Sequence, residues 1–411
     1  MHYQNNRLYI ENIPLADIAN QFGTPCYVYS KELLLNHWQK FHDALAKRPH
    51  LICYAVKANT NLAILNLFAK LNSGFDIVSI GELERVLAAG GDPNKIVFSG
   101  VGKKVDEMVR ALNIGIHCFN IESDVELRRL HEVAKSQKKI APISLRINPN
   151  IDARTHPHIA TGLNENKFGI AYTDALSIID QLKNFPHLKL IGIGSHIGSQ
   201  ITELNPFISA IDKLLELHHQ LKTKGIEIEH INIGGGLGVH YQYETTPTIE
   251  EYAAALSQKF PSSLKIILEP GRAIVANAGI LLTKIEYLKH TPHKNFAIVD
   301  AAMNDLLRPA LYDAWHKIEP IHLKETIEKK LYDIVGPVCE SADFLGKQRT
   351  LAIETGDLLA VYSAGAYGFS MSSNYNSRPR AAEVMIDGTE AHLIRARETI
   401  QDLFAHEKMI K

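Results

Sequence analysis

Between about residues 50 and 272 the chain alternates short apolar runs with amphipathic stretches, and this alternation constrains the fold most strongly. The apolar runs are rich in β-branched and aromatic residues, as buried strands are, and the stretches between them have a helical period. Eight strands alternating with helices over this length predict a (β/α)₈ barrel rather than an open doubly wound sheet. The predicted strands are 51–57, 74–79, 95–100, 116–120, 142–149, 190–198, 230–236 and 264–270, and helical patterns include 81–91, 125–136, 206–225 and 248–260.

The pattern changes after residue 272, where strand-like runs follow one another with turns and little helix between them. This is typical of a mainly antiparallel β-domain. The opening run 7–14 is also strand-like, so we expect it to join that domain. We therefore predict a barrel over 27–272 and a β-domain built from 1–26 and 273–411. The strand-like runs of the second part are 280–288, 296–302, 331–339, 358–367 and 381–388.

Composition excludes several classes of function. The formal net charge of -1 over 411 residues shows no excess of basic residues of the kind that binds nucleic acid or an anionic membrane. The N-terminus does not resemble a signal peptide, and no apolar run is long enough to span a bilayer. The four cysteines have neither CxxC nor zinc-ligand spacing, so we expect reduced thiols in a cytoplasmic enzyme and no metal site. They are Cys26, Cys53, Cys118 and Cys339.

Lys57 ends the first predicted strand, LICYAVK, and an amine in that place needs an explanation. Lysine is almost never fully buried unless another group pairs with it. Lys57 could simply emerge from a core strand into solvent. Alternatively, its amine points into a pocket, where it can form a Schiff base with a carbonyl group.

Other polar residues favour the second interpretation, because they fall at the ends of the predicted strands. In barrels of this kind the chemistry gathers at the carboxyl ends of the strands. Each residue taken alone has a structural explanation, since a glycine run or Glu-Pro-Gly can be only a turn. Their convergence at one predicted rim indicates a site. The residues are Lys57, Asp76, Arg146, His196, Ser199, Gly234, Gly235, Gly236, Glu269, Pro270, Gly271 and Arg272.

The glycines after the seventh and eighth strands lie where barrels commonly bind phosphate through backbone N–H groups. An amine, a phosphate cradle and a carboxylate are together what pyridoxal 5'-phosphate requires. Lys57 would hold the aldehyde, the glycines would hold the phosphate, and an acid would keep the pyridine nitrogen protonated. The sequence therefore predicts a pyridoxal-phosphate enzyme.

Longer motifs make the chain resemble the diaminopimelate decarboxylases over essentially its whole length and in order. YAVKAN and EPGR alone would indicate only the wider class of barrel-type (fold type III) pyridoxal-phosphate decarboxylases and racemases. HPHIATGLNENKFGI (156–170) and NYNSRPR (374–380) are narrower and point to this family. The other matching stretches are SLRINPN, GSHIGSQ, NIGGGLG, EPGRAIVANAG, NDLLRPALY, GPVCESADF and GAYGFSMSSNYNSRPR.

The resemblance implies decarboxylation of meso-2,6-diaminopimelate to L-lysine and CO₂, the last step of lysine synthesis, in a homodimer whose subunits share active sites. It implies that Lys57 carries the cofactor, His196 stacks on its ring and Glu269 bonds its nitrogen. Cys339 would donate a proton across the dimer interface. Residues implied to contact the cofactor also include Gly235, the 269–272 turn and Tyr367, and those implied to bind substrate are Arg272, Arg308, Tyr312, Glu340 and Tyr367.

Chemistry supports several of these roles. A thiol suits proton donation because its pKa lies near working pH. Arginine pairs bidentately with carboxylate, so Arg272 and Arg308 fit a substrate that carries a second amino-acid head group. The structural alternatives are that Arg308 is a surface residue and that Cys339 is a small buried hydrophobe.

Three other functions remain open. An amino-acid racemase of this fold is expected to place arginine, rather than Glu269, at the pyridine nitrogen. A decarboxylase for ornithine or arginine would leave Arg308 and Tyr312 without a distal carboxylate to bind. A non-catalytic binder with the same fold would not need Lys57, Glu269 and Cys339 together.

Overall fold

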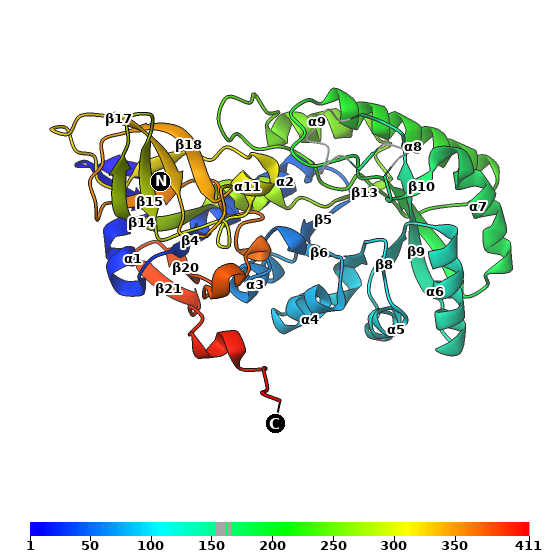
Figure 1. The fold of residues 1–411 in the computed structure, drawn as a ribbon. Coiled ribbons are helices and arrows are strands. Elements are labelled where there is room, and N and C mark those ends of the chain that lie inside the picture. The colour runs from blue at the N-terminus through cyan, green and yellow to red at the C-terminus, as the bar shows by residue number, and fades with distance from the viewer. Residues whose placement is uncertain (153–160, 163–165, 411) are drawn as a thin grey trace. The chain divides into compact units, whose positions relative to one another are not determined.

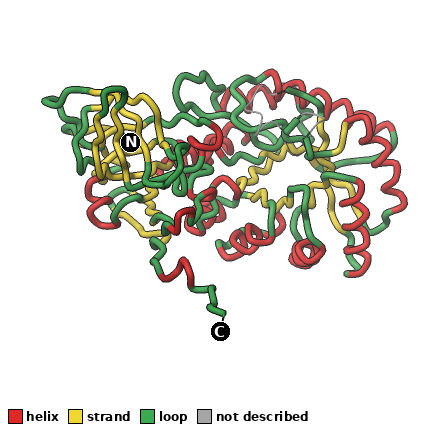
Figure 2. Tube along the Cα trace, viewed as in Figure 1, coloured by secondary structure: helices red, strands yellow, loops and turns green. Residues whose placement is uncertain are grey.

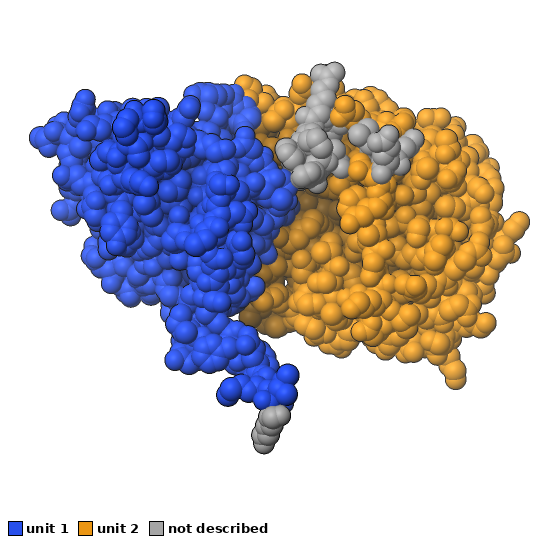
Figure 3. Space-filling view, in the orientation of Figure 1, with its two compact units in different colours: residues 1–36, 240–244, 274–411 blue, residues 37–239, 245–273 orange. Residues whose placement is uncertain are grey.

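A closed ring of parallel strands occupies the middle of the chain in the computed structural model (Figure 1), which describes residues 1–152, 161–162 and 166–410. Two compact units make up the chain (Figure 3). The barrel unit comprises His37–Val239 and Thr245–Ala273, and the β unit comprises Met1–Asn36, His240–Glu244 and Ile274–Lys411. Among the described residues, no helix has both the length and the apolar character needed to cross a membrane.

The ring runs β9, β11, β12, β13, β5, β6, β7, β8 and closes because β8 pairs back with β9. Every pairing in it is parallel, and β10 adds a short strand beside β9. The predicted barrel is therefore confirmed. The strands are β5 (His50–Ala55), β6 (Gly74–Ile77), β7 (Ile96–Phe98), β8 (Cys118–Ile121), β9 (Ala141–Asn148), β10 (Ile170–Ala171), β11 (Leu188–Gly194), β12 (His230–Asn232) and β13 (Lys265–Leu268).

Helices surround this ring of strands (Figure 2). Several begin at a side-chain cap supplied by the loop that leaves a strand: Ser79 and Ser123 each accept a hydrogen bond from the backbone N–H three residues ahead, and Thr248 forms a capping box with Glu251. The helices of this part are α2 (Lys31–Leu45), α3 (Leu62–Lys70), α4 (Ile80–Ala88), α5 (Val105–Ile114), α6 (Asp124–Ser136), α7 (Ala175–Gln181), α8 (Asn205–Thr223) and α9 (Ile249–Lys259).

Most barrel strands end earlier than the sequence pattern predicts, and this places the polar residues in loops. β5 ends at Ala55, so Lys57 lies in a single turn of 3₁₀ helix, Val56–Ala58. β12 ends at Asn232, so the three glycines follow the strand rather than belong to it. Apolar character continues past the last ladder hydrogen bond because residues just after the strands, such as Val56, Ile197 and Ile233, are still buried.

A second sheet forms the β unit, in the order β18-β17-β15-β14-β4-β20-β21, with β16 and β19 attached through β14. Most pairings are antiparallel, as predicted, while β15–β17 and β20–β4 are parallel. The strands are β4 (Cys26–Ser30), β14 (Gly279–His290), β15 (Asn295–Val299), β16 (Ile318–Pro320), β17 (Lys330–Val335), β18 (Phe344–Leu351), β19 (Leu358–Val361), β20 (Ala382–Asp387) and β21 (Glu390–Arg395).

The N-terminal part of the chain joins this unit in two ways. β4 inserts between β14 and β20, and its five residues are all buried. Ahead of it, β1 (His2–Gln4), β2 (Arg7–Ile10) and β3 (Ile13–Pro14) form a small antiparallel sheet, followed by α1 (Leu15–Phe22). Leu8 and Ile10 of β2 pack in one core with Val28, Ile280 and Val384. The run 7–14 thus belongs to the β unit, as the sequence predicts.

Candidate active site at the barrel mouth

The carboxyl ends of the barrel strands bring together most of the polar residues that the sequence singles out. Lys57 follows β5, Asp76 lies on β6, Arg146 on β9, and Glu269 follows β13. His196 and Ser199 follow β11, and the three glycines follow β12. Parallel strands of a closed barrel all end at the same rim, so residues distant in sequence meet there.

Lys57 and Asp76 form an ion pair at this rim, with 2.5 Å between Lys57 Nζ and Asp76 Oδ2. The Asp76 side chain is fully buried, whereas that of Lys57 is 38% exposed, so the amine reaches solvent at the mouth. Asp76 Oδ1 is buried and has no hydrogen-bond partner among the residues that the structure describes. A buried carboxylate oxygen without a partner is costly, so this atom is available for a bound molecule.

Glu269 is held by two asparagines that the sequence analysis did not identify. Its Oε1 accepts hydrogen bonds from Asn232 Nδ2 at 2.6 Å and from Asn120 Nδ2 at 3.1 Å. Burial, and then the nearby Asp76 carboxylate, raise the pKa of Glu269 to about 7, while Lys57 and Asn232 act in the opposite direction. The carboxyl group therefore exchanges its proton near neutral pH. The sequence did hold one indication of their role, because both asparagines lie at or near the ends of predicted barrel strands.

The glycines after β12 are required by the backbone and by close packing. Gly234 and Gly236 have φ angles of +70° and +107°, which other residues rarely adopt. A Cβ atom on Gly235 would lie 2.2 Å from the carbonyl oxygen of Glu269. Neighbouring strand ends consequently approach closely enough to present main-chain N–H groups to an anion.

His196 lies against these glycines, and the Gly235 N–H donates to its Nδ1 at 3.3 Å. Burial, followed by the charges of Arg146 and Lys57, lowers the pKa of His196 well below its ordinary value. The ring is therefore neutral, with its proton on Nε2. A neutral imidazole can stack on an aromatic ring without adding charge to the site.

Two arginines at the mouth have protein partners. Arg146 Nη1 lies 2.8 Å from Oε1 of Glu122, a residue that the sequence analysis missed and that also accepts from the Gly100 N–H. The buried Arg272 donates through Nη2 to Ser199 Oγ at 3.0 Å. Arg272 and Ser199 were expected at one site, and the structure brings them into direct contact.

The remaining candidates lie in the β unit. Arg308 opens the short helix α11 (Arg308–Tyr312) and is buried; its guanidinium lies over the Tyr241 ring at 4.6 Å, and its Nη1 is 2.8 Å from His316 Nε2. Because His316 Nδ1 contacts the Tyr362 carbonyl oxygen at 2.8 Å, that nitrogen carries the proton and Nε2 accepts from Arg308. Arg308 is therefore not the surface residue of the alternative interpretation.

Cys339 and Glu340 lie in an exposed loop of the β unit. The Cys339 N–H donates to Asn376 Oδ1 at 3.1 Å, and the Tyr375 hydroxyl donates to Glu340 Oε2 at 3.0 Å. The NYNSRPR motif thus contacts both residues, although the sequence analysis gave its side chains no role. An exposed Cys339 is not a small buried hydrophobe.

Tyr367 has a φ of +54°, a left-handed conformation that is uncommon for tyrosine. Of the motif at 156–170, residues 156–160 and 163–165 lie outside the described part of the chain.

Comparison with known proteins identifies relatives along the whole chain. Residues 31–276 match the family model described as pyridoxal-dependent decarboxylase, pyridoxal binding domain. Diaminopimelate decarboxylase of Vibrio cholerae is 58% identical over 411 residues, covering 100% of this chain and 98% of that protein. The enzyme of Pseudomonas aeruginosa is 55% identical over 409 residues, covering 99% and 98%. The crystal structure of diaminopimelate decarboxylase from Helicobacter pylori complexed with L-lysine matches with a TM-score of 0.92 at 44% identity, covering 96% of this chain and 99% of that one.

Proposed function

This chain belongs to the diaminopimelate decarboxylase family, and from that premise we propose which of its residues carry the reaction. The reaction removes CO₂ from meso-2,6-diaminopimelate and yields L-lysine, the last step of lysine biosynthesis. The observation that carries the residue assignment is the ion pair of Lys57 with Asp76 at the same barrel mouth as Glu269 and the glycine run.

Pyridoxal 5'-phosphate fits the groups at this mouth. The Lys57 amine reaches solvent there, Asp76 Oδ1 lacks a hydrogen-bond partner among the described residues, and Gly235 lets its backbone approach Glu269 and Pro270 closely. Lys57 would bind the aldehyde carbon, while Gly234–Gly236 and the 269–272 turn, with Arg272 and Ser199, would hold the phosphate. When bound, the cofactor supplies an electron sink for the carbanion that loss of CO₂ leaves.

Glu269 and His196 would set the charge around the ring. With a pKa near 7, Glu269 can ionise at working pH and would hold a proton at the pyridine nitrogen. Asn120 and Asn232 keep its Oε1 in place, so this position needs no reorganisation during the reaction. His196, neutral and fixed by the Gly235 N–H, would stack on the ring. Asp76 would orient the Lys57 amine through their ion pair. Arg146 would support the site through its ion pair with Glu122.

Substrate selection would depend on charge. The buried Arg308, oriented by His316 and Tyr241, presents a guanidinium suited to a distal carboxylate. Tyr312, Tyr367 and Glu340 would complete the recognition of the far amino-acid head, with Glu340 facing its ammonium group. A substrate without a distal carboxylate would leave the Arg308 charge without that partner.

Cys339 would return the proton to the former α-carbon, and we propose that it does so across a homodimer. Its thiol is exposed and its loop is tied to Asn376 and, through Glu340, to Tyr375. A thiol that delivers protons must stay reduced, which supports a cytoplasmic location. No nucleic acid or membrane partner is needed for this chemistry.

The direct experiment is to incubate the purified protein with pyridoxal phosphate and meso-diaminopimelate. We expect L-lysine and CO₂ in equal amounts, and no product from ornithine or arginine. Release of the corresponding diamine from ornithine would favour the related basic amino-acid decarboxylases. Appearance of D-lysine from L-lysine would favour a racemase, and no turnover with any substrate would indicate a non-catalytic binder.

A further inference from the structure

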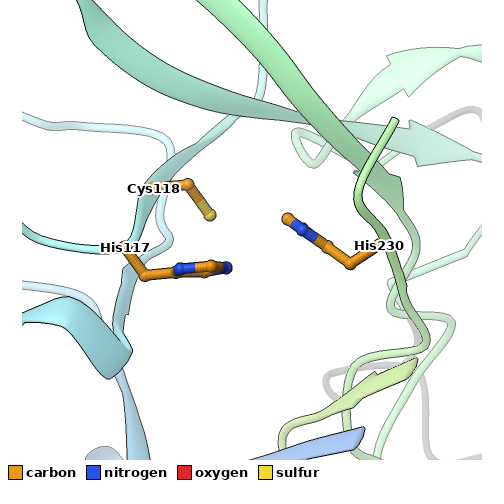
Figure 4. A group of neighbouring side chains, drawn as sticks. All are labelled: His117, Cys118 and His230. Carbon is orange, nitrogen blue, oxygen red and sulfur yellow. The ribbon is translucent and has the colours of Figure 1, made fainter. Parts of the chain in front are cut away.

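The opposite end of the barrel holds a second cluster of reactive side chains, His117, Cys118 and His230. One ligand atom from each lies within 4.8 Å of the others. Figure 4 shows the two imidazoles and the thiol pointing into one space. Cys118 begins β8 and His230 begins β12, so this cluster lies at the amino ends of strands whose carboxyl ends form the mouth.

Backbone geometry explains how the three residues converge. His117 sits on a bend just before β8, so it and its neighbour Cys118 can reach the same space. His230 approaches from a strand that is separated from β8 by β11 and β9 around the ring. Gly192 on β11 pairs with His230, and a Cβ atom there would lie 2.2 Å from His230 Nε2. The imidazole occupies space that any larger residue at position 192 would take.

Three imidazole nitrogens in this cluster lack partners among the described residues, whereas the Cys118 thiol donates to Asn120 Oδ1 at 3.8 Å. His230 has no exposed surface, and neither of its ring nitrogens has a hydrogen-bond partner among the described residues. The same holds for the buried Nε2 of His117. Burial lowers the pKa of His230 to about 3 and also lowers that of His117, so both rings are neutral and each offers a lone pair. Leaving such buried atoms unsatisfied is unfavourable, so a bound ligand that they could contact would be stabilising.

We propose that His117, Cys118 and His230 form a binding site for a soft metal ion, and that copper(I) is preferred over zinc(II). Two imidazole nitrogens and one thiolate sulfur are a donor set typical of thiophilic ions. The site lies on the barrel's own strands and does not depend on the function assigned to the mouth. No cysteine or histidine spacing marks it in the sequence, since His230 comes from a strand that is distant from β8 in the sequence and not adjacent to it in the ring.

Charge decides between the two ions. On coordination the Cys118 thiol loses its proton to solvent, and the thiolate forms a bond to the metal. One negative charge then neutralises copper(I), whereas zinc(II) would leave a net positive charge inside the barrel. Lys265, which pairs with His230 in the strand register, adds a positive charge near the cluster, and Glu229 adds a negative one that offsets it at His117. A buried charge without compensation is strongly unfavourable, so the monovalent ion fits better.

Copper(I), supplied anaerobically as its acetonitrile complex to the cofactor-loaded full chain, tests the site. After removal of loose metal against a copper(I) chelator, we expect one equivalent of copper per chain and no displacement by excess zinc(II). Cys118→Ala and His230→Gln should each weaken retention at least about tenfold, as loss of even supporting groups does in metal sites. Cys53→Ala is the matched control, because Cys53 is a buried cysteine of the same core cluster outside the triad and should leave retention unchanged.

Adventitious binding at the exposed Cys339 is tested with Cys339→Ser, which should keep its copper. If His230→Gln fails to fold by circular dichroism, Cys118→Ala decides the question, because it replaces one small buried residue by another. The proposal is overturned if wild type retains no copper, if Cys118→Ala retains as much as wild type, or if zinc(II) displaces copper(I).

Discussion

The two ends of the barrel carry opposite kinds of polar chemistry on the same strands. β12 begins with His230 and ends with Asn232, while on β8 Cys118 precedes Asn120 by two residues. Residues two apart on a strand face the same side, so each strand presents one group toward the bottom and one toward the mouth. At the bottom the groups are neutral and buried. At the mouth the asparagines hold Glu269, beside an ion pair open to solvent.

This difference shows what a reactive charge needs in a barrel interior. Lys57 has both a partner and solvent, because Asp76 lies 2.5 Å away and the Lys57 side chain remains partly exposed. At the opposite end, His230 is fully buried and its ring nitrogens have no protein partner among the described residues, and burial lowers its pKa to about 3. Hydration and pairing, rather than residue type, therefore separate the site where covalent chemistry is expected from the end where the histidines are neutral.

Replacing the lysine at each end should give the largest contrast. Lys57→Ala is expected to lower kcat/KM for diaminopimelate by about 10⁴- to 10⁶-fold, as loss of a catalytic nucleophile does. Lys265→Ala, at the bottom end of β13, should change it by less than about threefold. Steady-state assays of lysine release measure both. Comparable losses in the two variants would remove the distinction between the ends.

Mixing two inactive variants tests whether the mouth is completed by a second subunit. Lys57→Ala and Cys339→Ala homodimers should each be nearly inactive. If equal amounts exchange freely, about half of the dimers are heterodimers, and one of the two sites in each carries neither defect. Activity should therefore recover to about a quarter of wild type.

The recovery depends on subunit exchange, which native mass spectrometry can confirm. With exchange confirmed, no recovery would mean that Lys57 and Cys339 act within one chain. The decarboxylation itself would be unaffected by that outcome.

Arg308→Ala should lower kcat/KM for diaminopimelate by about 30- to 4000-fold, because breaking a buried charge pair on one side costs about 2–5 kcal/mol. Arg308→Lys should recover little, since an ammonium cannot reproduce the bidentate pairing. Cofactor absorbance should persist in both. Arg110→Ala is the control, because its exposed pair with Glu84 contributes little. Unchanged kinetics in Arg308→Ala would show that this residue does not read the distal carboxylate.

The smallest expected effect concerns pH and the Glu269 carboxyl group. Its pKa is raised from 4.5 to about 7 on folding, so the folded state binds the proton more tightly than the unfolded state. Stability from this group is present at low pH and is lost as pH rises from about 4.5 through 7. In cofactor-free protein, Glu269→Gln should therefore gain about 1–3 kcal/mol over wild type between pH 5 and 8.

Urea unfolding at each pH measures this gain, and Glu229→Gln, an exposed position at the bottom of β12, is the control for removing a carboxylate. A difference between Glu269→Gln and wild type that stays constant with pH would contradict the raised pKa.

Periodicity was sufficient to predict the barrel because each strand and helix is a local pattern, and parallel strands must then end at one rim. Lys57, Asp76, Glu269 and the glycines could be placed there for the same reason. β4 was missed because its five residues, CYVYS, have no polar alternation, and its burial comes from β14 and β20, which follow 250 or more residues later in the chain.

Contacts between particular side chains could not be predicted from the sequence, for a different reason. The contacts of Asn120 and Asn232 with Glu269, of Glu122 with Arg146, and of His316 with Arg308 depend on distances across the ring or between loops. Asparagine or histidine at a strand end is also common without any such role. The His117–Cys118–His230 cluster is the extreme case, since a glycine on a third strand makes room for it.

Borohydride reduction followed by peptide mapping tests the assignment of the mouth most directly. Reduction of the cofactor-loaded protein fixes pyridoxal phosphate to the lysine that holds it, whatever the substrate. The account predicts a single labelled peptide containing Lys57, and no label in Lys57→Ala. Label on any other lysine, and above all on Lys265 at the opposite end of the barrel, would contradict it.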